Sequence, residues 1–167
     1  GFKNATVGAG SSTLIYMLKK YLAQKYYVVA IEVGKNDFGF FNEKDMYSVS
    51  SPNLKPAIDR FNLASYILVD LNNEQNLELC DYVIYLIEPT TIKLNKLIQR
   101  NRIIFGKLVN KKVIPNKSAL LNNDVSDFES EAGIRVFYNM PSLDERKRNG
   151  IIGDFLVKLG LLNNNSN

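Results

Sequence analysis

The sequence contains no histidine, and its 167 residues include one cysteine, Cys80. Without an imidazole base, Ser-His and Cys-His catalysis are excluded. One thiol without imidazole partners also gives no basis for a zinc site. A single cysteine cannot form an internal disulfide and fits a reducing compartment. No apolar run reaches the roughly 18 residues of a membrane-spanning helix, so we expect a cytoplasmic protein without a transmembrane segment.

The sequence also lacks a strong excess of positive or negative side chains. The chain has 21 Lys and Arg against 17 Asp and Glu, and the net charge of +4 favours solubility over nucleic-acid binding. The apolar fraction of 46% and charged fraction of 23% are typical of a globular domain. The length suits one domain with one core. We expect residues 1–162 to form it and the polar tail 163–167 to be disordered.

Apolar runs typical of buried strands alternate with amphipathic stretches typical of helices. The sequence predicts strands over residues 26–33, 66–70, 81–87, 112–115 and 134–140, and a short edge strand over 46–50. It predicts helices over 14–24, 54–62, 91–108, 122–132 and 150–162, and a loop over 34–45. This alternation predicts a three-layer α/β/α fold with a mostly parallel sheet.

One stretch, Gly8-Ala9-Gly10-Ser11-Ser12-Thr13, leads directly into the first predicted helix. Two close glycines allow backbone N–H groups to surround an anion, and the start of a helix adds positive potential. The usual phosphate loop reads G-x-x-x-x-G-K-[ST]. With Gly10 as its last glycine, Ser11 stands at the lysine and Ser12 at the magnesium-binding hydroxyl. The turn and the hydroxyl are present, but the cation is missing from the motif. Because only residues 1–5 precede the loop, we expect the chain to begin part-way through its first strand.

Polar residues end the predicted strands on either side of this loop: Glu32, Asp70, Glu88 and Asn116. In parallel sheets, ligands bind beyond the carboxyl ends of the strands, so we expect these residues beside the loop. Each also has a purely structural interpretation. Ser12 is either a magnesium ligand or a simple helix N-cap. Glu32 is either a catalytic carboxylate or a partner of Lys35, and Asn116 is either a base reader or a turn residue.

These segments, in this order, resemble the ParA/MinD family of deviant phosphate-loop ATPases, and most of all its TadZ/CpaE branch, which positions pilus and secretion machinery. Residues 6–13 (TVGAGSST) stand where the family has KGGVGKTT, and residues 65–70 (SYILVD) are similar to its DYVLID. Residues 114–118 (IPNKS) are similar to the strand whose following asparagine reads adenine. Residues 133–150 are similar to the late segment beside the base. The resemblance covers roughly residues 2–161.

The resemblance implies a nucleotide site with ATP and magnesium. Its phosphate-binding residues would be Gly8, Ala9, Gly10, Ser11, Ser12 and Thr13, with Asn116 and Pro141 at the base. Ser12 and Asp70 would bind magnesium, and Glu32 and Asp70 are the catalytic candidates.

Three departures from the family pattern fall on its chemistry. Thr6 replaces the signature lysine that a partner subunit would present across an ATP-bound dimer. Ser11 replaces the lysine that bridges the outer phosphates, and Gly34 replaces an acid that orients water. Loss of both lysines would cost about 3–6 kcal/mol of binding, since hydrogen bonds to charged groups contribute about 1.5–3 kcal/mol each. We therefore expect a nucleotide-binding fold with little or no ATPase activity.

The resemblance implies a localisation, assembly or regulatory factor, with protein partners from a pilus, secretion or partition system. Under this interpretation, the chain would form a homodimer, and its partners would recruit it to the membrane or cell pole. Two alternatives stay open. One is a weak ATPase that uses a relocated lysine, Lys3 or Lys35. The other is a basic DNA-binding partition protein that uses the lysines and arginines of residues 93–112.

Overall fold

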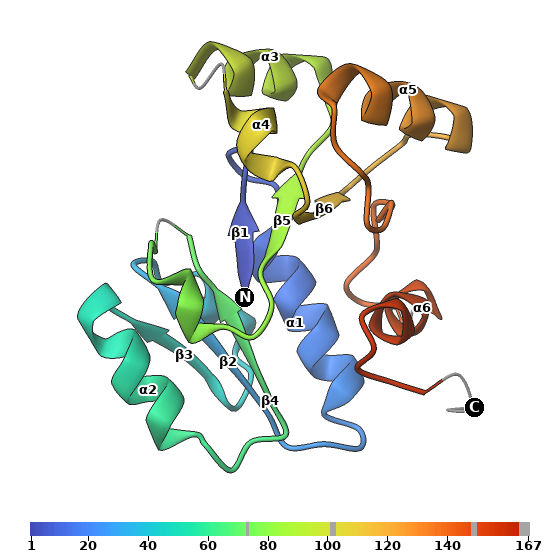
Figure 1. Cartoon of the computed structure of the whole chain (residues 1–167). Coiled ribbons are helices and arrows are strands. Elements are labelled where there is room, and N and C mark those ends of the chain that lie inside the picture. Colours follow the sequence, from blue (N-terminus) through green and yellow to red (C-terminus); the bar gives the residue numbers. More distant parts are fainter. Residues whose placement is uncertain (73, 101–102, 148–149, 164–167) are drawn as a thin grey trace.

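In the computed structural model, which describes residues 1–72, 74–100, 103–147 and 150–163, one sheet of six parallel strands forms the centre of the protein (Figure 1). The strand order is β3-β2-β4-β1-β5-β6. The strands are β1 (Phe2–Asn4), β2 (Val28–Val33), β3 (Met46–Val49), β4 (Tyr66–Asp70), β5 (Ile84–Ile87) and β6 (Lys112–Pro115). The pairing is parallel throughout, which confirms the predicted α/β fold.

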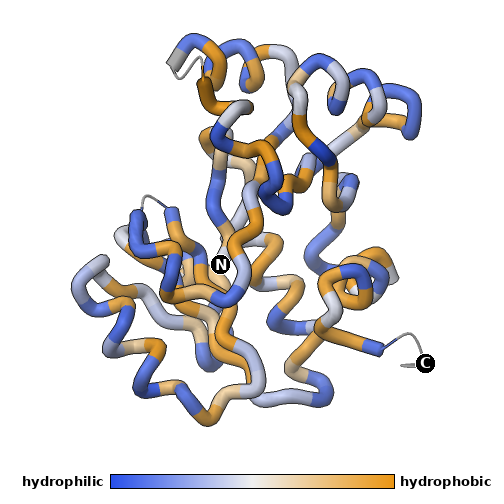
Figure 2. Tube along the Cα trace, in the orientation of Figure 1, coloured by the Kyte–Doolittle hydropathy of each residue, from blue (hydrophilic) through white to orange (hydrophobic). Residues whose placement is uncertain are grey.

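Helices cover both faces of the sheet (Figure 1). They are α1 (Ser11–Leu22), α2 (Leu54–Arg60), α3 (Thr91–Arg100), α4 (Ile104–Leu108), α5 (Asn122–Ala132) and α6 (Gly150–Lys158). Helices α1 and α6 pack on one face, α2 packs on the other, and α4 and α5 cover β5 and β6. Apolar residues follow the central strands (Figure 2). No described helix has both the length and the hydrophobicity that crossing a membrane requires.

Strand β2 is buried along its whole length, and its side chains divide between two cores. Val28 and Ala30 face α1, whereas Val29, Ile31 and Val33 face α2. Successive side chains of a strand point to opposite faces, so a central strand covered on both sides needs apolar residues at every position. This is why the run around β2 is continuous rather than alternating.

The apolar stripe that faces α1 ends in polar residues at the carboxyl edge of the sheet. Phe2 and Leu68 face α1, and two residues later Asn4 and Asp70 contact Ser11 at the start of that helix. The period of two along a strand places each polar residue on the same face as the apolar residue before it. A buried polar corner therefore lies where α1 begins.

The prediction of a fifth buried strand over residues 134–140 is wrong. The segment forms one isolated bridge with β6, at Val113 with Val136, and a second isolated bridge, at Ser118 with Pro141, lies just beyond both. Its N–H donors, Phe137 and Met140, are three residues apart, whereas their acceptors are the carbonyls of Val113 and Pro115, two residues apart. A regular ladder needs equal steps on both strands, so the mismatch prevents a continuous strand.

Other boundaries differ from the prediction in smaller ways. The helix predicted over 91–108 is two helices, because Ile103 leaves the helical conformation (φ −102°, ψ 9°) and α4 packs its apolar residues against β5 and β6. The loop predicted over 34–45 contains a 3₁₀ turn, Phe38–Phe41, in which Phe38 is buried. Strand β5 begins at Ile84 and helix α6 ends at Lys158, so both are shorter than predicted. Strand β4 and helix α5 have the predicted bounds. Of the predicted tail, residues 164–167 lie outside the described residues.

Candidate functional site

Residues 5–10, which we call the glycine loop, connect the carboxyl end of β1 to the start of α1. Gly8 (φ 70°) and Gly10 (φ 90°) both adopt left-handed conformations, which a side chain would strain. Within the loop, the N–H of Ala9 donates to the carbonyl of Thr6 at 3.2 Å, and the N–H of Leu14 donates to Gly10 at 3.0 Å. The N–H groups of residues 11–13 precede the first intrahelical bond, so they have no acceptor within α1. The loop thus presents the donors of an anion site.

Ser11 is directed into the protein rather than toward a ligand. Its side chain is buried, its hydroxyl donates to Asp70 Oδ2 at 2.7 Å, and it accepts from Asn4 Nδ2 at 2.8 Å. The residue at the lysine position of the motif therefore joins α1 to β1 and β4. Its hydroxyl is occupied by these two partners, which leaves its backbone N–H as its contribution to an anion site.

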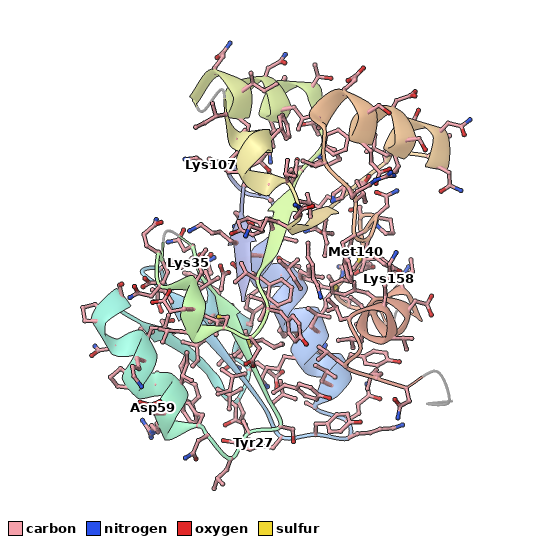
Figure 3. The ribbon with its side chains drawn as sticks, in the orientation of Figure 1. Tyr27, Lys35, Asp59, Lys107, Met140 and Lys158 are labelled. Carbon is pink, nitrogen blue, oxygen red and sulfur yellow. The ribbon has the colours of Figure 1, made fainter. Side chains whose placement is uncertain are left out.

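Ser12 lies in a cluster of charged groups that includes Lys35, Asp37 and Asp70. The Lys35 ammonium is 2.7 Å from Ser12 Oγ, 2.7 Å from Asp70 Oδ2 and 3.2 Å from Asp37 Oδ2. The Ser12 hydroxyl is also 3.0 Å from Asp37 Oδ2 and 3.2 Å from Asp70 Oδ2. We call these four residues the Lys35 cluster. Figure 3 shows Lys35 and Tyr27 at opposite ends of β2, with Lys35 at the carboxyl end.

The charges in the Lys35 cluster stabilise one another. Burial lowers the pKa of Lys35, but hydrogen bonds and charges from Asp70 and Asp37 outweigh that effect and raise it. Burial also raises the pKa of Asp37, and the bonds from Lys35 and Ser12 reverse this and lower it. Both groups are therefore charged at neutral pH. Asp70 is fully buried, so Lys35 is the cation that balances its charge.

The structure brings together Ser12 and Asp70, the two side chains predicted to bind magnesium. Their oxygens are 3.2 Å apart, and the ammonium of Lys35 contacts both of them at 2.7 Å. Magnesium requires about six oxygen ligands at 2.0–2.1 Å and brings two further positive charges. The described residues contain no group of three or more acidic, cysteine or histidine side chains that could hold a metal.

Glu32 takes a structural position. Its carboxylate is buried and accepts from the backbone N–H of Phe38 at 2.8 Å and the hydroxyl of Ser48 at 2.6 Å. Its Cα pairs with that of Asp70 across β2 and β4, yet its described hydrogen bonds go to the Phe38 turn and β3 rather than to the loop. The carboxylate thus holds the turn over the sheet, while Oε2 has no partner within the described part of the chain.

Asn116 and Lys117 hold the other side of the glycine loop. Asn116 Nδ2 donates to the carbonyl of Ala9 at 2.6 Å, and Lys117 Nζ donates to the carbonyl of Gly8 at 3.3 Å. A Cβ at Gly10 would lie 2.9 Å from Lys117 Cε and 3.0 Å from Asn116 Nδ2. The predicted base-reading amide is therefore used to position the loop.

Pro141 lines a small cavity beside the same loop, together with Gly10, Thr13, Asn116 and Leu143. The cavity has a volume of about 50 Å³. An apolar cavity of about 150 Å³ accommodates a benzene ring, so this space is too small for a base without movement of its walls. The structure thus brings Pro141 and Asn116 together around a small pocket.

A second ion pair lies beside the loop at the end of β5. Glu88 accepts from Lys93 at 2.5 Å and lies 3.9 Å from the ammonium of Lys117. Its N–H donates to the hydroxyl of Thr6 at 2.8 Å, and Thr6 is buried. The Lys93 ammonium would also lie 3.6 Å from a Cβ at Gly8. The motif itself lacks a cation, but Lys35, Lys93 and Lys117 from other segments all lie beside the loop.

Sequence reasoning missed Asp37 and the roles of Lys93 and Lys117. Lys117 was identifiable in principle, since it directly follows Asn116 at a strand end. Lys93 stands in the basic segment 93–112, which the sequence suggested only as a DNA-binding alternative, and its contact with Glu88 depends on how α3 begins. Asp37 lies in the segment predicted as an ordinary loop.

Comparisons with known proteins support the fold. No protein-family model and no curated protein matches this sequence. Among solved structures, the chain is similar to one described as a LAO/AO transport system kinase, with a TM-score of 0.51 and 14% sequence identity. The likeness covers 96% of this chain and 58% of the other, so this chain spans little more than half of that protein. At this identity the likeness shows the fold alone, an α/β fold built on one parallel sheet.

Proposed function

We propose that this chain is a ParA/MinD-like nucleotide-binding protein that hydrolyses nucleotide slowly or not at all and acts by binding partners. The observation that carries the proposal is the geometry of the glycine loop. Two left-handed glycines and the N-terminus of α1 lie at the carboxyl edge of a parallel sheet. Backbone N–H groups and the helix dipole at this position favour a phosphate group.

The lysines beside the loop support binding more strongly than the sequence motif did. The expected loss of about 3–6 kcal/mol assumed that both cations were absent. Lys117 lies over Gly10, and Lys93 lies near Gly8. Glu88 balances one of these two charges, so the three side chains together leave one net positive charge at the loop. We therefore expect phosphate affinity closer to that of an intact loop.

The arrangement of acids argues against efficient hydrolysis. Phosphoryl transfer needs an oriented water and neutralised charge in the transition state. Gly34 has no side chain to orient water, and the carboxylate of Glu32 is committed to Phe38 and Ser48. Asp70 is committed to Ser11, Ser12 and Lys35. Each of these two carboxylates thus has one oxygen held by structural contacts, and the other oxygen, Glu32 Oε2 or Asp70 Oδ1, is buried.

Two apolar side chains are exposed in the loop and in the helix that follows β5. Val7, within the loop, is 74% exposed, and Ile92, in the first turn of α3, is 68% exposed. Contiguous apolar surface marks a protein contact, and we propose that these two side chains belong to one. In line with the TadZ/CpaE resemblance, we propose a localisation or assembly factor whose loop face contacts a partner or a second copy of the chain.

The proposal is tested by calorimetric titration with ATP and with GTP, followed by a turnover assay on the same protein. We expect saturable binding with a turnover below one per minute. Gly10→Ala is the loop variant, since a Cβ there would collide with Lys117 and Asn116, and we expect it to lose binding. Sustained turnover that Asp70→Ala abolishes would overturn the pseudoenzyme part, and no binding of either nucleotide would overturn the whole.

A weak ATPase is the second candidate, and one contact favours it: the Lys35 ammonium is 2.7 Å from Ser12 Oγ, close to the start of α1. Lys3 is less suitable, because its ammonium donates to the carbonyl of Glu74 at 2.6 Å. In this case Lys35→Ala would abolish a measurable turnover, whereas Lys3→Ala would retain it.

A further inference from the structure

We propose that the ammonium of Lys35 takes the place of a divalent cation beside the glycine loop, so that this chain binds phosphate groups without a metal. The inference rests on the proposed nucleotide-binding function and concerns how that site is charged. The observation behind it is that Lys35 and a magnesium ion would need the same oxygens.

The ammonium is fully coordinated by the cluster. A lysine ammonium has three N–H donors. Lys35 has three oxygen partners, Ser12 Oγ at 2.7 Å, Asp70 Oδ2 at 2.7 Å and Asp37 Oδ2 at 3.2 Å. These oxygens come from α1, β4 and the segment after β2. The contacts therefore join three separate parts of the chain around one positive charge.

A metal could bind there only if Lys35 left. The side chain of Lys35 is 19% exposed and that of Asp70 is 0% exposed, so the pair is largely shielded from water. Departure of the ammonium would leave the buried carboxylate without its cation, and Asp70 Oδ1 has no partner within the described residues. A buried unpaired charge is strongly unfavourable. Entry of a dication beside a retained ammonium would add repulsion between like charges.

The backbone after β2 directs Lys35 to this position. Gly34 has φ 68°, a left-handed conformation, and its N–H donates to the carbonyl of Val49 at 2.9 Å. The chain turns at Gly34, and the next residue, Lys35, contacts Ser12 and Asp70. The absence of an acid at residue 34 and the presence of a cation at residue 35 are thus two parts of one local structure.

The first arm of the test uses the unmodified chain. Affinities for ATP and GTP are measured in excess EDTA and in millimolar MgCl₂, with NaCl added to match ionic strength. We expect affinity in EDTA equal to that in magnesium within about threefold, or tighter. Affinity at least tenfold tighter with magnesium would overturn the inference and leave the proposed function standing. No binding in either condition would overturn the proposed function itself.

The second arm needs no nucleotide. Thermal unfolding is followed for the unmodified chain, Lys35→Ala and Lys44→Ala. Each protein is measured in EDTA and in about 10 mM MgCl₂, a concentration at which the added ions still screen charge interactions only modestly. Lys44 is exposed, so Lys44→Ala removes the same charge from the same segment without touching the Lys35 cluster. We expect magnesium to raise the midpoint of Lys35→Ala by several degrees and to leave the other two unchanged.

Equal magnesium responses in all three proteins would overturn the inference. If Lys35→Ala does not fold, Lys35→Ala combined with Asp70→Asn removes the buried charge as well, and this protein should fold and show no magnesium response. A magnesium response in that double variant would also overturn the inference, because its metal site would not involve Asp70.

Discussion

The side chain of Asn116 donates a 2.6 Å hydrogen bond to the carbonyl oxygen of Ala9, a residue 107 positions earlier in the chain. Both residues are buried. The bond links the end of β6 to the glycine loop and holds the loop carbonyl that lies between the two left-handed glycines. The shape of the glycine loop therefore depends on the residue that follows an edge strand, β6, which β5 separates from β1.

Asn116→Ala should leave the Ala9 carbonyl buried and without its partner. An unsatisfied buried acceptor costs about 1–3 kcal/mol, so we expect a loss of that size in the free energy of unfolding. Urea denaturation measures it. The control is Asn123→Ala, on the exposed side of α5, which should change stability by no more than about 0.5 kcal/mol. Equal effects of the two variants would contradict the role of Asn116.

Gly10→Ala should destabilise the loop through both its backbone and its neighbours. Residue 10 has φ 90°, and a Cβ would lie 2.9 Å from Lys117 Cε. A left-handed conformation for a non-glycine residue costs about 1–3 kcal/mol where it is sparsely populated. Gly106→Ala is the matched control, since Gly106 lies in α4 with nothing within 4 Å of its Cβ. It should be neutral or stabilising by up to about 1 kcal/mol. Denaturation curves in which Gly10→Ala is more stable than Gly106→Ala would refute this prediction.

Lys35→Met should be among the most destabilising single substitutions of a charged residue here. It removes the cation beside the fully buried Asp70, and breaking one side of a buried pair costs about 3–5 kcal/mol. Lys55→Met breaks the exposed pair with Asp59, whose side chains are 66% and 62% exposed, and should cost at most about 0.5 kcal/mol. Adding Asp70→Asn to Lys35→Met should restore part of the loss. If the double variant is less stable than Lys35→Met, the charge of Asp70 is not the cause.

The contribution of Lys35 to stability should depend on pH in the alkaline range. Its pKa is raised above 10.5, the ordinary value for lysine. A group whose pKa is raised in the folded state binds its proton more tightly there, so its contribution is fully present below 10.5 and is lost as pH rises through the folded pKa. The difference in free energy of unfolding between the unmodified chain and Lys35→Met should be constant from about pH 7 to about pH 9 and shrink above 10.5. If this difference in free energy of unfolding grows at alkaline pH instead, the predicted direction of the Lys35 contribution is wrong.

Sequence patterns predicted the elements that are defined by their own residues. The run from Tyr66 to Asp70 is apolar and ends in a carboxylate, and β4 has these bounds. Helix α5 also has its predicted bounds, because its sequence and flanking residues mark both ends. Segment 134–140 has the composition of a strand, but its pairing with β6 depends on a register that the segment does not contain.

The sequence by itself determined the α/β alternation, the two glycines of the loop and the polar residues at the strand ends, because periodicity and backbone freedom are local properties. Only the tertiary structure decided which charges meet at the loop. Lys35, Lys93 and Lys117 lie in three separate segments, and the lysine missing from the motif is replaced by ammonium groups that folding brings to the same edge of the sheet. Electrostatic interactions act through space, so a motif that lacks a cation does not establish that its site lacks one.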